Sequence, residues 1–61
     1  MKKKELKNLA KKIAEAEKIV QTSIDEYEIE EAKTLILNLS KKISFEDLDE
    51  LDEMVMELLE T

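Results

Sequence analysis

The sequence predicts an all-α protein. Apolar residues recur at helical steps of three and four along the chain, and helix-forming residues dominate a composition of 61 residues that contains no Gly or Pro. We therefore expect one helical domain over residues 1–61, either a small three-helix bundle or an assembly of helical hairpins. Without Cys or His, the chain has no disulfide and no thiolate or imidazole metal site to stabilise so small a core. We expect oligomerisation to complete this core.

The first predicted helix covers about residues 3–21. Its lysines lie mostly away from an apolar stripe whose members follow one another at steps of three and four. The stripe comprises Leu6, Leu9, Ile13, Ala16, Val20 and Ile24, flanked by Ala10 and Ile19.

The second predicted helix covers about residues 24–41, after a shift in the phase of the apolar stripe. The step from Tyr27 to Ile29 corresponds to a rotation of about 200° on a helix, so one straight helix cannot keep both stripes on the same side. Ser23 followed by Glu26 has the capping-box pattern, with Asp25 also in the first turn. These residues predict a break there; a continuous first and second helix is the alternative. The expected buried residues are Ile29, Ala32, Leu35, Ile36, Leu39 and Ile43.

The third predicted helix covers about residues 45–59. Ser44 is its predicted cap, with Glu46 and Asp47 in the first turn, where the helix dipole favours negative charge. The segment is clearly amphipathic, with apolar residues on one side and glutamates on the other. The expected buried residues are Leu48, Leu51, Met54, Val55, Leu58 and Leu59.

Charge divides the chain into a basic and an acidic part within a net charge of −6. Residues 1–18 carry seven lysines against three glutamates, whereas residues 19–61 carry three lysines against thirteen acidic residues. The third helix presents a row of glutamates that could dock on a basic protein surface, although a solvated outer face is the simpler interpretation. This acidic face comprises Glu46, Glu50, Glu53, Glu57 and Glu60.

Four large apolar residues lie off the main stripes of their helices. Tyr27 and Leu37 fall on the side of the second helix opposite its buried face, and Met56 and Phe45 lie off the stripe of the third. In a chain with a small core, such residues indicate an interface with another copy or with a protein partner.

The composition also excludes most chemistry. A chain without Cys, His or a Gly-rich loop offers no recognisable catalytic, cofactor-binding or metal-binding residues, so we do not expect an enzyme or a bound cofactor. We do not expect nucleic-acid binding, because the lysines are accompanied by no Arg and no interleaved aromatic residue. No apolar run approaches the length of about 18 residues that predicts a membrane span, and we expect a cytoplasmic protein.

The sequence is therefore most consistent with a small acidic helical protein–protein interaction module, such as an adaptor or an inhibitor of phage or regulatory type that acts by binding. One alternative is an oligomeric protein that binds or sequesters an anionic, nucleotide-like small molecule in pockets between protomers, lined by Tyr27 and first-helix lysines. The other alternative is a de novo designed helical bundle.

Overall fold

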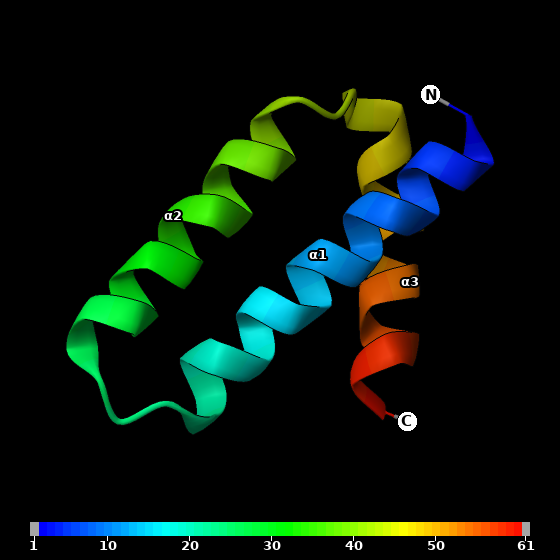
Figure 1. Ribbon diagram of the computed structural model, residues 1–61. Helices are drawn as coiled ribbons and strands as arrows, with labels where there is room; N and C mark the ends of the chain where they lie inside the picture. The colour runs from blue at the N-terminus through cyan, green and yellow to red at the C-terminus, as the bar shows by residue number, and fades with distance from the viewer. Residues whose placement is uncertain (1, 61) are drawn as a thin grey trace.

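The computed structural model describes residues 2–60 and contains three α-helices (Figure 1). Helix α1 spans Lys3–Thr22, α2 spans Glu26–Lys41 and α3 spans Phe45–Glu60. No strand is present in this part of the chain. The predicted all-α class and the three-helix bundle are thus confirmed, and the first two helices are separate; oligomerisation stays a prediction.

Helix α1 ends before the last residue of its predicted stripe. Ser23 has an extended backbone (φ −74°, ψ 144°), and its N–H donates the last helical bond to the carbonyl of Ile19. Ile24 therefore lies in the connection between α1 and α2, where its side chain is 100% exposed. Our placement of Ile24 on the buried face was wrong, because helical periodicity in the sequence continued past the end of the helix.

The cap of α2 also differs from our prediction. Asp25, and not Ser23, is the N-cap residue, since its carboxylate accepts a 3.0 Å hydrogen bond from the N–H of Tyr27. The helix consequently begins at Glu26 instead of about Ile24. Ser23 supports the turn from outside the helix: its hydroxyl donates to the carboxylate of Glu28 and accepts from the N–H of Asp25.

The start of α3 combines Ser44 and Asp47, the two residues paired in the predicted cap. The hydroxyl of Ser44 donates to the carboxylate of Asp47 at 2.9 Å, and the N–H of Asp47 donates to the carbonyl of Ser44 at 3.0 Å. The first turn of α3 is acidic, with Glu46 and Asp47 near the positive end of the helix dipole.

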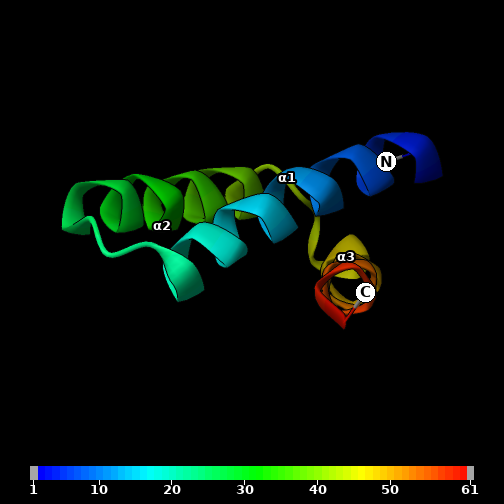
Figure 2. The same ribbon diagram turned by 60° about the horizontal axis from the view of Figure 1, so that its bottom comes forward.

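Helix α1 lies at the centre of the arrangement. It packs against α2 as an antiparallel hairpin and against α3 on another side, whereas α2 and α3 make only marginal contact with each other. Figure 2 shows α1 and α2 as one layer, with α3 crossing beneath α1 and seen nearly end-on. The molecule is flat: its Cα atoms extend over 34 × 25 × 15 Å.

The hydrophobic core lies at one end of the hairpin, where all three helices meet. In the described part of the chain, its buried cluster draws on the first half of α1, the end of α2, the connection between α2 and α3, and the middle of α3: Leu6, Ala10, Ile13, Ala14, Leu39, Ile43, Leu51 and Val55. Ala10 and Ala14, one helical turn apart, are both buried, and such small side chains allow neighbouring helices to approach closely.

The other end of the hairpin is thinner. Ala16 and Ala32 are buried there, but they do not belong to the main cluster. Ile19 and Leu35 are exposed, although we placed Leu35 on the buried face and Ile19 at its edge. They stay exposed because a two-helix layer leaves part of each helix without a packing partner.

No helix within residues 2–60 is both long enough and apolar enough to cross a membrane.

Replacing Leu51, whose side chain is almost completely buried, tests the position of the core. We expect Leu51→Ala to lower the free energy of unfolding by about 2–5 kcal/mol, because it removes buried methyl groups and leaves a cavity. The control Ile24→Ala, at a fully exposed site in the connection between α1 and α2, should change it by no more than about 0.5 kcal/mol. Urea denaturation followed by circular dichroism measures both, and equal losses would contradict this core.

The cap of α2 can be tested separately. We expect Asp25→Ala to cost about 0.5–2 kcal/mol of unfolding free energy, because the N–H of Tyr27 loses its acceptor. Ser23→Ala should cost less, since Ser23 lies outside the helix. Thermal and urea denaturation of the two variants provide the comparison, and a larger cost for Ser23→Ala would restore the cap predicted from the sequence.

Candidate functional site

The four residues predicted as an interface all have exposed side chains. The exposed fractions are 71% for Tyr27, 57% for Leu37, 89% for Phe45 and 61% for Met56. We refer to these four as the outer apolar residues. Their exposure is a property of the structure, while their role in binding stays a prediction.

Tyr27 and Leu37 lie on the outer side of α2, away from the buried Ala32 and Leu39. Thr34 is also exposed in this helix, and its hydroxyl donates back to the carbonyl of Glu30 at 3.0 Å, which leaves the hydroxyl proton occupied within the helix. Ten residues separate Tyr27 from Leu37, about 15 Å along the helix axis. The two apolar side chains therefore mark the two ends of a surface on α2.

Leu35 extends this surface towards α1 and was not among the predicted interface residues. It lines a groove of about 280 Å³ between α1 and α2, whose base contains the buried Ala16 and Ala32 and whose wall contains Ile19. Lys12, Glu15, Glu28 and Glu31 surround this groove. Leu35 also lines a second hollow with Thr34 and Asn38 on the outer side of α2. The exposure of Leu35 could not be predicted from the sequence, because Leu35 has the helical spacing of a core residue.

Phe45 and Met56 occupy one side of α3. Eleven residues, close to three helical turns, separate them, so they point in nearly the same direction about 16 Å apart. Asp49 and Asp52 lie between them at helical spacing and are exposed. Because α2 and α3 make only marginal contact, the two pairs of outer apolar residues belong to two separate helix surfaces.

The predicted acidic face of α3 is exposed to solvent. All five of its glutamates are exposed: Glu46, Glu50, Glu53, Glu57 and Glu60. Glu57 additionally borders a cleft between α1 and α3. The face is thus accessible to a basic partner over the whole length of the helix.

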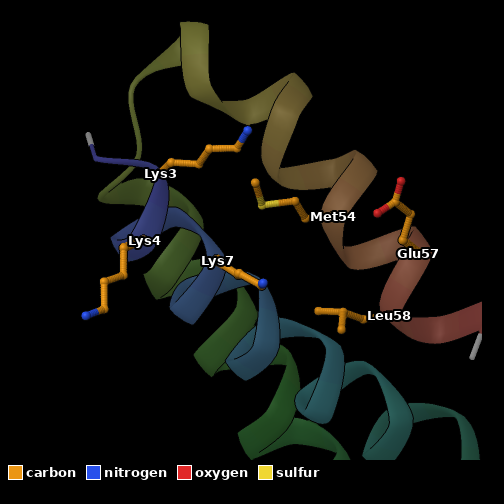
Figure 3. A pocket seen from close by; sticks show the side chains of 6 residues that line it. All are labelled: Lys3, Lys4, Lys7, Met54, Glu57 and Leu58. Atoms are coloured by element: carbon orange, nitrogen blue, oxygen red, sulfur yellow. The ribbon is translucent and has the colours of Figure 1, made fainter.

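A cleft between α1 and α3 has a volume of about 570 Å³. Three lysines of the first two turns of α1 line it on one side, and residues of the second half of α3 line it on the other (Figure 3). Its lining residues are Lys3, Lys4, Lys7, Met54, Glu57 and Leu58. We refer to this feature as the lysine cleft.

Tyr27 does not line the lysine cleft of the single chain, and the pocket between protomers that we considered from the sequence stays a prediction. The cleft lies at the start of α1, whereas Tyr27 lies beyond its end, in the first turn of α2 (Figure 1). A helix of 20 residues is about 30 Å long, so the tyrosine and the lysines are at opposite ends of the hairpin.

The described residues provide no further chemical site of the kinds that we considered. Within residues 2–60, no group of three or more Asp or Glu residues is placed to hold a metal ion. No charged or polar side chain in the same range is buried, and Glu17, the one acid near the middle of a predicted stripe, is only half-buried. The expectation of a protein without catalytic activity stays a prediction.

No protein-family model, no curated protein and no solved structure matches this chain.

Proposed function

We propose that this protein is a small acidic interaction module that works by binding a protein surface, either a partner or another copy of the chain. The observation that carries this proposal is the exposure of all four outer apolar residues, two on α2 and two on α3. An adaptor or an inhibitor that acts by covering a surface of its partner would need only such exposed contact residues, and no catalytic group.

The apolar surface favours association because covering it releases free energy. Full burial of a large apolar side chain contributes about 1.5–3 kcal/mol, so a partner that covered Tyr27 and Leu37 would gain several kcal/mol. Tyr27 suits the centre of an interface, since its ring can be buried while its hydroxyl bonds to the partner.

The total accessible surface supports the same proposal. The chain exposes 4915 Å². A compact monomer of its mass, 7.1 kDa, would expose about 4,100 Å² by the usual scaling of surface with mass. The excess of about 800 Å² is comparable with the area that one partner contributes to an interface of standard size.

The acidic face of α3 adds a preference for partners. Five exposed glutamates on one side of a helix produce a negative potential that attracts basic surfaces and repels acidic ones. This attraction accelerates encounter, while the outer apolar residues supply the contact that keeps the complex together. Added salt should therefore slow association more than it speeds dissociation.

The charge variant Leu37→Glu tests this proposal by placing a carboxylate in the apolar surface of α2. We expect the parent chain to associate, with itself or with a protein partner, and Leu37→Glu to weaken that association by about tenfold or more, because the new charge must be desolvated. Sedimentation velocity measures the mass in solution, and the stability of each variant is measured in parallel.

Asn8→Glu, which adds the same charge at an exposed site on α1, is the matched control and should leave association unchanged. The proposal fails when the parent and Leu37→Glu are both monomers of equal stability and bind the same proteins equally well.

A further inference from the structure

We propose that the lysine cleft binds an anionic amphiphile, a small molecule that carries a phosphate or carboxylate group on an apolar body. This site lies between α1 and α3 and includes none of the outer apolar residues; it shares only Glu57 with the acidic face of α3.

The charges in the cleft are cationic in a protein that is acidic overall. Lys3, Lys4 and Lys7 line it, against the single carboxylate of Glu57, while the whole chain has a net charge of −6. Figure 3 shows the side chains of Lys3 and Lys7 extending into the space between the helices, whereas Lys4 turns away. The ammonium groups of Lys3 and Lys7 therefore both border the space in which an anionic group would bind.

The α3 side of the cleft supplies the apolar contact. Met54 and Leu58 are half-buried, and both face the two lysines across the cleft (Figure 3). A methionine side chain is flexible and polarisable, so it can adapt to an aromatic ring as well as to an alkyl chain. The volume of about 570 Å³ falls within the range of small-molecule sites.

The local sequence of α1 is unfavourable for the isolated helix, and a bound anion would reverse this. Lysines in a first turn oppose the positive end of the helix dipole, and the N-cap residue Lys2 makes no side-chain capping bond. The first turn of α1 holds one acidic residue, Glu5, beside these lysines, whereas the first turns of α2 and α3 hold two acidic residues each and no lysine. A local conflict of this kind is expected where residues serve a ligand in addition to the fold.

Glu57 gives the cleft a selectivity that a plain cationic patch lacks. Its carboxylate lies on the α3 edge of the cleft and is directed away from Lys3 and Lys7 (Figure 3), and its charge opposes the binding of a free inorganic anion. A ligand with an apolar body gains contact with Met54 and Leu58 that offsets this repulsion. We therefore expect inorganic phosphate to bind more weakly than an organic anion.

Titrations of the full chain with three probes test the proposal: adenosine monophosphate, decanoate below its micelle concentration, and inorganic phosphate. Backbone amide shifts in the NMR spectrum locate the site and give each affinity. We expect at least one of the two organic anions to shift residues 3–7 and 54–58, and to bind at least about tenfold more tightly than inorganic phosphate. Binding of adenosine monophosphate would identify the apolar body of the ligand as a nucleoside, and binding of decanoate would identify it as an alkyl chain.

Variants separate the cleft from general attraction between charges. The double variant Lys3→Gln/Lys7→Gln should weaken binding by at least about tenfold, while the control Lys33→Gln/Lys41→Gln, with the same change in net charge outside the cleft, should stay within about twofold. All four lysines are exposed, so neither variant disturbs the core, and circular dichroism confirms equal helicity. Glu57→Gln should strengthen the binding of phosphate.

Three results would each overturn the proposal. The first is that neither organic anion binds at a concentration of about 10 mM, which corresponds to an affinity too weak for a built site. The second is that phosphate alone binds as tightly as both organic anions, which would leave Met54 and Leu58 without a role. The third is that the control variant loses as much affinity as Lys3→Gln/Lys7→Gln.

Discussion

The packing of two helices on α1 is the interaction on which the rest of this structure depends. Helices α2 and α3 each bury their apolar sides against α1 and make only marginal contact with each other. Helix α1 must therefore be apolar over a wider arc than its partners, and it achieves this with Leu6 and Ile13 together with the small Ala10 and Ala14. Removing α1 would leave two amphipathic helices with no common core.

This arrangement also determines where the surface is unusual. Because the core forms at one end of the hairpin, the other end is a single layer in which Ile19 and Leu35 remain exposed. The crossing of α3 over α1 brings the lysines of the first turns next to Met54 and Leu58, and so creates the lysine cleft. The exposed apolar residues at the thin end and the lysine cleft thus both follow from one arrangement, in which α2 and α3 pack on α1 and only marginally on each other.

The sequence predicts the three helices well, but it predicts poorly which helices pack against one another. Particular residues show the physical reasons. Periodicity identifies the apolar side of each helix, and the outer positions of Tyr27, Leu37, Phe45 and Met56 follow from it directly. It does not reveal that α2 and α3 pack on α1 but only marginally on each other. Part of the buried surface of α1 consists of Ala10 and Ala14, which carry little hydrophobic signal. Ile24 continues the apolar stripe of α1 in the sequence, but α1 ends at Thr22, so Ile24 lies outside the helix. The lysine cleft joins residues about fifty positions apart, and no local pattern indicates such a pairing.

Native-state amide hydrogen exchange, measured by NMR residue by residue, tests the central position of α1 most directly. The slowest exchange should occur in α1 between Leu6 and Ala14, where both neighbouring helices cover the backbone, and exchange in the first half of α2 should be clearly faster. If the first half of α2 is as strongly protected as this part of α1, or if α1 exchanges before α2 and α3, then α1 is not the element that holds the bundle together.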